Sequence, residues 1–564
     1  MFSSSRIVRH LTVASVLRVK RNMRMGVYLA LFLLPLWSEA QNLGGPPSPG
    51  LDATNIYTAF SLPSLADGPG GALANVATTL QVGMRAQTLG LTGQSPIDSW
   101  STAQNTLAQI SQTANIPQAP PTIFQGSTAS ALNQFIANPV ITRIRVTSSS
   151  LTVDQPVLIQ RNTLSLDFAG AQLTPGGSDP YLIRIQKASN VIIENGGFAS
   201  GNSAVLVSAA SQVIVRNMHI QNLTGDGIVV TGSTGVLVSR NVISGLAGAP
   251  IIVHRGSTFS VVRDNEISGN QGPSNVTAGI VLSDREVDLT SNPLALLGPD
   301  GYWVITQPIT TRLNPPHDNV ILANRVSENL SSGIYSDGGV RNIIAYNLVV
   351  SNGKEGLCLD NGSTANVVTG NTLLQNGQRW GESDYVMSED GITAGGRLPD
   401  GTPAEKVPGI SIDNAIYNVI FTNQVWQNYG GGIKIVRTGY FNSIGMNTIY
   451  NNNVGASSGF HFFGIELGAA PGNPPSADLD YTPSEGNIIF SNPIRGPHYS
   501  GIYFDYGSTL NNVLDNVILD AENWALESAA VMQNTSLDNL TNLPSRNMTA
   551  GLDPSLLPLI RVAP

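Results

Sequence analysis

The sequence predicts an all-β solenoid in which short parallel strands stack in coils of 23–24 residues. An asparagine precedes a short apolar segment ten times, at spacings that return to one period. The composition agrees, because 58 glycines, 34 prolines and only 12% charged residues in a chain of 564 suit many strands joined by tight turns. A repeat of this length is the signature of a solenoid.

The repeated asparagine defines the period. Six of the nine successive gaps are 23 or 24 residues, and the other three equal one period plus an insertion of roughly 35, 28 and 21 residues. A buried asparagine is costly alone, but stacked asparagines can satisfy one another's side-chain amides. We therefore expect one asparagine ladder at a corner of the coil, formed by Asn217, Asn241, Asn265, Asn324, Asn347, Asn371, Asn423, Asn447, Asn492 and Asn516.

Each period holds three strand-like pieces, such as GIVV, TGVLVS and NVISG in residues 227–245. Three short strands joined by turns make one triangular coil, and stacked coils give parallel, in-register strands. Ile228 and Val230 should then point inward, because alternate residues of a strand face the same side.

This pattern and the opening strand NTLSLDFAGAQLTP resemble the right-handed parallel β-helix proteins of the pectin-lyase-like superfamily, over roughly residues 140–535. The resemblance implies a single-stranded right-handed parallel β-helix. It leaves the activity open, because the superfamily includes lyases, hydrolases, epimerases and non-catalytic adhesins.

The first part of the chain is expected to be a targeting segment. In residues 1–40, basic residues precede the apolar run GVYLALFLLPLW, and Ala40 fits the end of a signal peptide. The true start could be Met1, Met23 or Met25. The run is short for a membrane span, so we expect a secreted, periplasmic or cell-surface protein with no span after signal removal.

The remaining chain divides into three predicted parts. Residues 41–127 form a Gly-, Pro- and Ala-rich lead-in, residues 128–535 the β-helix with its N-terminal cap, and residues 536–564 a C-terminal tail or cap. Leu132, Phe135 and Ile136 recur at helical spacing, with Thr128 as the N-cap. A short helix at this place would cover the open end of the first coil.

Long loops are expected beside one strand column. Insertions near residues 285–316, 378–408 and 469–487 all adjoin the strand that begins G-I-x-x, and long loops on a tight scaffold often carry function. Trp303 in the first loop, and Trp380 and Tyr385 in the second, are candidates for stacking on sugar rings.

Polar side chains gather along the same column in the later coils. With the second and fourth positions of GIYSD-like strands inside, the third and fifth should face solvent. The third position supplies Tyr335, Lys434, Glu466 and Tyr503, and the fifth supplies His254, Asp337, Asp360, Asp413 and Asp505 as candidate site residues.

Three of these aspartates should stack closely. Asp337, Asp360 and Asp413 would lie about 4.8 Å apart on successive coils. Like charges about 5 Å apart repel by roughly 3 kcal/mol at an effective dielectric constant near 20. The stack needs a bound cation, a shared proton or hydrogen bonds to each carboxylate. Aspartate before Gly or Asn is also ordinary turn chemistry, so a functional and a structural interpretation stay open.

One mechanism is calcium-assisted proton abstraction by a lyase or epimerase acting on a uronate polymer. The three aspartates would hold Ca²⁺, Lys434 would act as base, and Arg437 or Tyr503 would stabilise the developing charge. This arrangement resembles calcium-dependent β-helix pectate lyases, although no adjacent Asp-Asp pair is present. The stretch NPPHD, residues 314–318, resembles the DPHD motif of mannuronan epimerases, with Asn in place of the first acid and one additional proline.

Two alternatives remain. A glycoside hydrolase could pair Asp337 with Asp413, or Asp413 with Glu466, because carboxylates about 5 Å or about 10 Å apart suit retaining or inverting hydrolysis. A non-catalytic β-helix could instead bind a glycan or a cell surface. The resemblance implies a polysaccharide partner for the two enzyme hypotheses. A net charge of −9 and no basic stripe argue against nucleic acid. The oligomeric state, including a trimer, is left open.

Overall fold

The computed structural model describes residues 119–272, 275–283, 295–297, 303–305, 314–377, 407–436, 439–452, 463–468, 484–505, 508–528, 534–537, 539–541, 543–545 and 549–550. All of them belong to one compact unit, Ala66–Pro564. The predicted signal peptide, 1–40, and residues 41–118 of the predicted lead-in, 41–127, lie outside the described residues.

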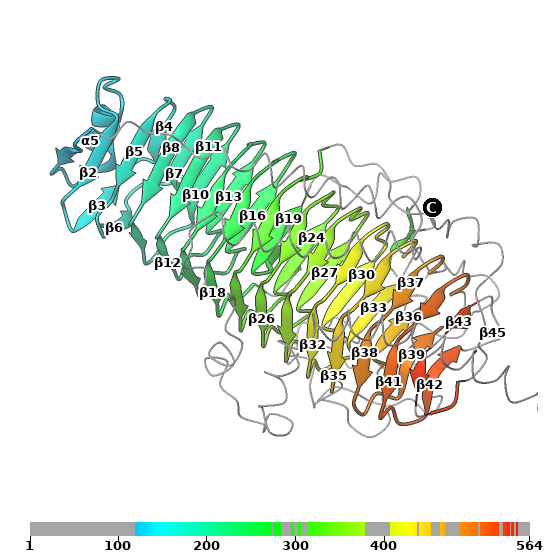
Figure 1. Cartoon of the computed structure of the whole chain (residues 1–564). Helices are drawn as coiled ribbons and strands as arrows, with labels where there is room; N and C mark the ends of the chain where they lie inside the picture. The colour runs from blue at the N-terminus through cyan, green and yellow to red at the C-terminus, as the bar shows by residue number, and fades with distance from the viewer. Residues whose placement is uncertain are drawn as a thin grey trace, which may run out of the picture. The chain divides into compact units, whose positions relative to one another are not determined.

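The described strands form three parallel sheets, here called sheets A, B and C, and each coil contributes one strand to each sheet in turn (Figure 1). Sheet A consists of β1 (Thr122–Phe124), β2 (Arg143–Val146), β5 (Leu164–Asp167), β8 (Ser189–Glu194), β11 (Ser211–Arg216), β14 (Leu237–Ser239), β17 (Val261–Arg263), β22 (Val320–Leu322), β25 (Ile343–Ala345), β28 (Val367–Thr369), β31 (Val419–Phe421), β34 (Ser443–Gly445), β37 (Ile488–Phe490), β40 (Asn512–Leu514), β43 (Thr535–Leu537) and β45 (Thr549–Ala550).

Sheet B follows sheet A along each coil. It consists of β3 (Ser150–Val153), β6 (Gln172–Pro175), β9 (Gly197–Phe198), β12 (His219–Gln221), β15 (Val242–Ser244), β18 (Glu266–Ser268), β23 (Arg325–Ser327), β26 (Leu348–Val350), β29 (Thr372–Leu374), β32 (Gln424–Trp426), β35 (Thr448–Tyr450), β38 (Pro493–Arg495), β41 (Val517–Leu519) and β44 (Leu540–Thr541).

Sheet C completes each coil and carries the G-I-x-x strands. It consists of β4 (Val157–Ile159), β7 (Tyr181–Gln186), β10 (Ser203–Ser208), β13 (Ile228–Thr231), β16 (Ile251–His254), β19 (Ile280–Ser283), β24 (Ile334–Asp337), β27 (Leu357–Asp360), β30 (Ile410–Asp413), β33 (Ile433–Val436), β36 (Ile465–Leu467), β39 (Ser500–Phe504) and β42 (Trp524–Ser528). Two elements lie outside the three sheets, the 3-10 turn η2 (Asn275–Thr277) and the antiparallel pair β20 (Ala295–Leu297) and β21 (Trp303–Ile305).

This topology confirms the predicted parallel β-helix. Each strand pairs in parallel with the strand one coil earlier and one coil later in the same sheet, and no cis peptide bond occurs in the described chain. Successive strands of one sheet are joined by a crossover through the other two sheets, and such parallel crossovers are right-handed. Alternate side chains point into the coil, so that Ile228, Val230 and their equivalents form a continuous apolar core along the stack.

The predicted cap is confirmed. Helix α5 (Ala129–Ile136) follows Thr128, whose side-chain oxygen accepts a hydrogen bond from the Ala131 amide, as an N-cap should. Leu132 and Ile136 are buried, and α5 lies at the N-terminal end of the stack (Figure 1). The helix thereby covers apolar surface that the first coil would otherwise expose.

The sheets extend beyond the predicted limits of 128 and 535. Sheet A begins at β1, which pairs with β2 and precedes the capping helix in sequence. At the other end, β44 and β45 continue sheets B and A into the segment expected to be a tail. Among the described residues, no helix is long and apolar enough to cross a bilayer.

Asparagine ladders support three corners of the coil, where one ladder was predicted. In each ladder the side-chain amide donates to the side-chain oxygen of the next asparagine, and that oxygen also accepts a backbone amide. The predicted ladder runs through Asn241, Asn265, Asn324, Asn347, Asn371, Asn423, Asn447, Asn492, Asn516 and Asn539. The second runs from Asn319 to Asn534 and the third from Asn270 to Asn452.

The assignment of Asn217 to the ladder is wrong. The inward position of that coil is held by Met218, which is fully buried and whose backbone amide donates to Asn241 Oδ1. Asn217 lies one residue earlier, has a φ of 53° and donates its side-chain amide to Asn195 Oδ1. The ladder therefore begins at Asn241, where apolar packing by methionine gives way to amide stacking.

Candidate functional site

Sheet C places the predicted site residues in consecutive coils and in the predicted register. Strands β24, β27, β30, β33, β36 and β39 follow one another in the sheet. The third positions pair as Tyr335↔Cys358↔Ser411↔Lys434↔Glu466↔Tyr503. At the fifth position His254, Ser283, Asp337 and Asp360 are direct partners, and Asp413 ends the next strand.

The stacked aspartates are stabilised by hydroxyl donors on neighbouring coils. Ser283 Oγ donates to Asp337 Oδ2 at 3.0 Å, and the Tyr335 hydroxyl donates to Asp360 Oδ2 at 2.8 Å. Asp360 Oδ1 also accepts the Asn361 amide at 2.7 Å, which is a turn contact. The repulsion between adjacent carboxylates is thus relieved by hydrogen bonds both from the turn and across coils.

The three aspartates do not form a cage for a metal. Asp337 and Asp360 are half-buried and Asp413 is 7% exposed. Across the described residues, no group of three or more His, Cys, Asp or Glu side chains lies close enough together to hold a metal ion. The geometry of these residues therefore gives no support to the calcium site expected at Asp337, Asp360 and Asp413.

Lys434 and Glu466 form a buried ion pair. The Lys434 Nζ lies 3.2 Å from Glu466 Oε1, and the two side chains are only 10% and 13% exposed. A general base must reach a proton of the substrate, whereas this Nζ contacts a carboxylate of the neighbouring strand and is largely covered. The pairing therefore disfavours the expected role of Lys434 as a base.

An aromatic cluster follows the ion pair in the next coil. The Tyr503 ring stacks on Phe463 with centroids 4.2 Å apart and planes 9° apart, and Tyr499 meets Phe463 edge-on. The Tyr503 hydroxyl lies 3.4 Å from Asp505 Oδ1. Burial, together with the charges of neighbouring acids that include Asp505, raises the pKa of Tyr503, so this phenol is a hydrogen-bond donor rather than a base.

The outer face of sheet C is more buried than the alternation pattern predicts. Tyr335, Cys358, Lys434 and His254 are each at most 9% exposed, although their positions point away from the core. An outward apolar cluster accounts for part of this, since Val229, Ile252, Ala249, Ala278, Val281, Tyr335 and Cys358 pack together. Burial raises the pKa of the Tyr335 hydroxyl, and the Asp360 and Asp337 charges raise it further, so it also stays protonated.

Three predicted site residues, Arg437, Trp380 and Tyr385, lie outside the described residues. Two others lie in strands. Trp303 is the first residue of β21, which pairs antiparallel with β20. His254 ends β16, where its Nδ1 lies 2.8 Å from the backbone oxygen of Ser283.

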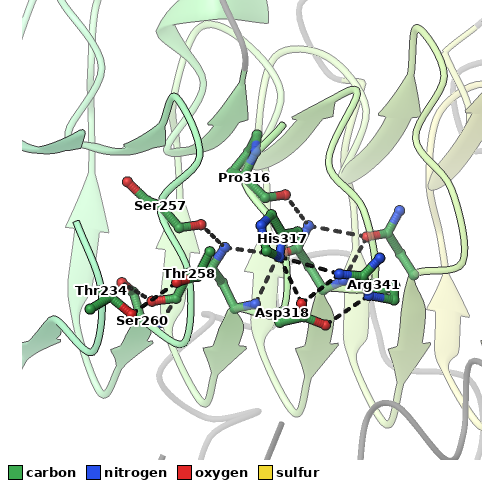
Figure 2. A network of polar contacts seen from close by, with 11 residues as sticks. Thr234, Ser257, Thr258, Ser260, Pro316, His317, Asp318 and Arg341 are labelled. Carbon is green, nitrogen blue, oxygen red and sulfur yellow. Dashed lines mark hydrogen bonds and ion pairs between the residues drawn. The ribbon is translucent and has the colours of Figure 1, made fainter. Parts of the chain in front are cut away.

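A second polar cluster lies at the corner between sheets C and A, in the NPPHD stretch (Figure 2). His317 Nδ1 is 2.7 Å from Asp318 Oδ2. On the next coil, Arg341 clamps the same carboxylate with two hydrogen bonds, from Nε to Oδ1 at 2.9 Å and from Nη2 to Oδ2 at 2.7 Å. We call these three residues the His317 cluster.

The His317 cluster is pre-organised for proton transfer. Burial alone would raise the pKa of Asp318, but hydrogen bonds from His317 and Arg341 outweigh it and lower that pKa. An ionised carboxylate accepts only, so the contact with Asp318 orients the imidazole through Nδ1, and Arg341 Nη2 lies 3.3 Å from the same nitrogen. The other ring nitrogen, Nε2, belongs to a side chain that is 34% exposed. This is the arrangement of an oriented general base.

The sequence held a signal for this cluster. His317 and Arg341 are 24 residues apart, which is one coil, so the period alone places them on neighbouring coils. Isolated bridges confirm the column, because Thr258, His317 and Val340 are successive parallel partners at the corner. Further along the network Thr234 and Thr258 share a hydrogen bond between their hydroxyls at 2.9 Å (Figure 2).

Two family models match parts of the chain. Residues 157–294 match the right handed beta helix region, and residues 310–388 match the family of the periplasmic copper-binding protein NosD. The second match includes the His317 cluster, Asp337 and Asp360. A search of curated proteins gave no significant match.

Solved structures of several kinds are similar to this chain. The A-module of mannuronan C-5 epimerase AlgE4 from Azotobacter vinelandii is 13% identical, with 73% of this chain and 90% of that one covered and a TM-score of 0.42. The catalytic unit of a GH87 α-1,3-glucanase from Streptomyces thermodiastaticus is 13% identical, covering 74% and 71%, with a TM-score of 0.44. PfbA, a surface adhesin of Streptococcus pneumoniae, is 13% identical, covering 71% and 86%, with a TM-score of 0.39.

At such identities these likenesses assign no activity. The strand order of the three sheets and the match to the β-helix region bear on the fold itself. On those grounds the chain has the right-handed parallel β-helix fold.

Proposed function

We propose that this protein is a polysaccharide lyase or epimerase that removes the proton beside the carboxylate of a uronate residue, with His317 as the base. The observation that carries the proposal is the His317 imidazole held at 2.7 Å by Asp318, which Arg341 clamps in turn. An imidazole that a carboxylate holds through Nδ1 keeps one orientation, so that Nε2 would meet the substrate proton in the same geometry at each encounter.

The chemistry follows from the cluster. Nε2 of His317 would take the proton at C5 of the uronate. In β-elimination the electron pair would form a C4–C5 double bond as the C4–O bond breaks, and the leaving oxygen would take a proton from solvent. In epimerisation a proton from solvent would instead be added to the opposite face of C5. Arg341 supplies a guanidinium beside the base, and its Nη1 makes no hydrogen bond among the described residues. A donor there would stabilise the carboxylate as its charge becomes enolate-like.

The test is isotope exchange on a panel of uronate polymers. The full chain would be incubated in D₂O with polymannuronate, polyguluronate, polygalacturonate and glucuronan, and deuterium at C5 would be measured by mass spectrometry. Absorbance of unsaturated ends would separate a lyase from an epimerase. We expect the wild type to give deuterium at C5 if it is an epimerase or unsaturated ends if it is a lyase, and His317→Gln to lose that signal. The control is His219→Gln, an exposed histidine on sheet B far from the cluster in the coil order.

Paired carboxylates favour a second candidate, glycoside hydrolysis. Asp337 and Asp360 are direct register partners on adjacent strands, a separation of about 5 Å that suits a retaining mechanism, and both are half-buried rather than fully enclosed. New reducing ends that appear without unsaturated ends, and that disappear in Asp337→Asn or Asp360→Asn, would establish this activity. Glycan binding with neither signal would leave the non-catalytic function.

A further inference from the structure

The outer face of sheet A changes character along the stack. In the early coils its outward side chains are partly charged, because Arg145 lies opposite Asp167 and Glu194 opposite Arg216. In the later coils the same positions are apolar, and β22, β25 and β31 read Val-Ile-Leu, Ile-Ile-Ala and Val-Ile-Phe. In parallel sheets, strands that are covered on both faces have such continuous apolar runs. The later strands therefore indicate a sheet that is covered outside as well as inside.

The outward side chains of these later strands are buried. Val320, Ile343, Val367 and Val419 are register partners on successive coils, and each is at most 2% exposed. They belong to an apolar cluster separate from the core inside the coils, here called the outer cluster, which consists of Val261, Val320, Leu322, Ala323, Ile343, Ala345, Val367, Val419, Phe421, Phe490 and Leu514.

The described residues do not supply the cover for the outer cluster. Among the described elements outside the three sheets, α5 packs against β3 and β4, η2 against β19, and β20 against β21. None of these contacts is with sheet A. The cover therefore comes from a part of the chain outside the described residues, and a second copy is not needed to explain the burial.

The chain enters the stack beside this face. β1 is the first strand of sheet A, and three residues before it the Ala119 oxygen accepts a hydrogen bond from Arg143 Nη1 at 2.9 Å. Arg143 is an outward residue of β2, so the chain before β1 lies next to the outward column. The compact unit that contains the stack begins at Ala66, whereas residues 1–65 form a separate unit. Residues 66–118 are thus the N-terminal part that belongs with the sheets.

One stretch of this segment has the pattern of an amphipathic helix. In WSTAQNTLAQISQTA, residues 100–114, the apolar residues follow one another at spacings of three, four, three and four, and no residue is charged. Such spacing places them on one face of a helix. An uncharged helix with one apolar face suits the uncharged outward positions of the later strands. The apolar residues are Trp100, Ala103, Leu107, Ile110 and Ala114.

The length of the chain brings this stretch to the apolar part of the face. Residues 115–118, if extended, span about 13 Å, and a helix over 100–114 spans about 22 Å. Together they reach about seven strand spacings, from β2 to β25, with the helix over β11 to β25. The first outward position of those strands is apolar throughout, namely Ile214, Leu237, Val261, Val320 and Ile343.

Burial in the early coils favours this segment over the long insertions. Ile214 in β11 points outward and is only 7% exposed. It lies in the stretch 119–272, which is described without a gap and holds no insertion. The insertion at 284–313 rejoins the stack at β22, three strands later in sheet A. A segment that enters at β1 passes β11 before it reaches β22.

We propose that the outer face of sheet A is the docking surface of this chain's own N-terminal segment, in which residues 100–114 lie as an amphipathic helix across β11 to β25, with Leu107 and Ile110 against the outward apolar column. This contact is independent of the proposed reaction and of any polysaccharide. It makes the N-terminal segment part of the folded scaffold.

The test is thiol labelling of a cysteine placed under the helix in the full chain. Val320→Cys is a small change at an outward position that is 0% exposed. Arg145→Cys is the matched probe at an open position of the same sheet, since that side chain is 52% exposed. The native Cys358 is buried, and burial raises the pKa of its thiol, so it should stay unreactive and report any global unfolding.

Two double substitutions in the segment carry the same added charge. Leu107→Glu with Ile110→Glu places both charges on the apolar face, whereas Asn105→Glu with Gln109→Glu places them on the opposite face. We expect the first pair to raise the labelling rate of Val320→Cys at least 30-fold and the second to change it less than threefold. Arg145→Cys should react at one rate in all backgrounds, and Cys358 in none.

A third pair tests the insertion as the occupant. Leu296→Glu with Val304→Glu places two charges in β20 and β21, where these residues are register partners. A rise in Val320→Cys labelling with this pair alone would assign the cover to residues 284–313 and overturn the proposal. Rapid labelling without any further substitution, or slow labelling in every background, would also overturn it.

A milder pair keeps the test decisive if the charged pair unfolds the protein, as labelling of Cys358 would show. Leu107→Ala with Ile110→Ala adds no charge and removes most of the apolar contact. We expect it to raise the labelling rate of Val320→Cys at least fivefold while Cys358 stays unreactive. An unchanged rate in this variant would overturn the proposal.

Discussion

Replacement of Asn371 by alanine should be among the most destabilising single changes in this protein. Asn371 is fully buried in the middle of the first ladder. Its Oδ1 accepts from the Asn347 backbone amide and from Asn347 Nδ2, both at 2.9 Å. Its Nδ2 donates to Asn423 Oδ1 at 2.9 Å and to the Ile344 oxygen at 2.8 Å. Nδ2 also lies 3.2 Å from the Thr369 oxygen, and alanine would remove all five contacts at once.

The expected cost follows from the groups left without a partner. Two buried donors on Asn347 lose their acceptor, whereas Asn423 Oδ1 still accepts the backbone amide of residue 371. A buried donor without a partner costs about 1–3 kcal/mol. The sum, with a small cavity, is about 3–5 kcal/mol of unfolding free energy, a large part of the typical stability of a domain.

The assay should report local as well as global stability, since solenoids do not always unfold in one step. Urea unfolding followed by circular dichroism would be combined with hydrogen exchange of the Asn347 amide. Asn217→Ala is the control, because that side chain donates one hydrogen bond and lies outside the ladder, so it should cost about 1 kcal/mol or less. A loss below about 1 kcal/mol in Asn371→Ala, or unchanged exchange at Asn347, would refute the ladder as a major source of stability.

Three other changes test separate contacts. His498 is fully buried, its ring nitrogens have no hydrogen-bond partner among the described residues, and burial lowers its pKa to about 4. Below pH 6.5 the unfolded state binds the proton and the folded state does not, so the free energy of unfolding should fall by about 3 kcal/mol between pH 6.5 and 4. Stability curves of His498→Leu should lack this fall, and an equal fall in both proteins would contradict the assignment. Lys434→Met should cost about 3–5 kcal/mol by leaving Glu466 buried and uncompensated, while adding Glu466→Gln should restore most of it in a double-mutant cycle; additive losses would show no coupling. Asp318→Asn should lower deuterium exchange by about 10²–10⁴-fold and alter its pH profile, whereas a change in KM alone would mean that Asp318 only supports the corner.

The repeat explains why the fold was predictable and why its details were not. A 23–24-residue spacing of asparagines defines stacked coils, and the cap could be read from Thr128 and the helical spacing after it. The same spacing does not decide which of two adjacent residues points inward. It therefore predicted Asn217, whereas Met218 is the buried residue. The second and third ladders have the same period and could have been found by repeating the search with other asparagines.

The candidate site was predictable in register but not in its contacts. The sequence aligned Asp337, Asp360 and Lys434 correctly, because the inward residues and the leading glycine recur at the same positions of each strand in the column. It did not reveal the Lys434–Glu466 pair, since distance and burial depend on how the outer face is covered. His317 and Arg341 lie one full period apart, and only that spacing indicates that they are neighbours. The NPPHD stretch by itself does not indicate the contact with Arg341.

The coils keep their register on both sides of very long insertions. Strand β19 pairs with β24, Ile280 opposite Ile334, although residues 284–313 intervene, and β27 pairs with β30 across residues 378–406. An insertion at a corner therefore changes no hydrogen bond of the stack. Segments inserted at these corners should therefore be exchangeable as cassettes while the scaffold, and its stability, stay as they are.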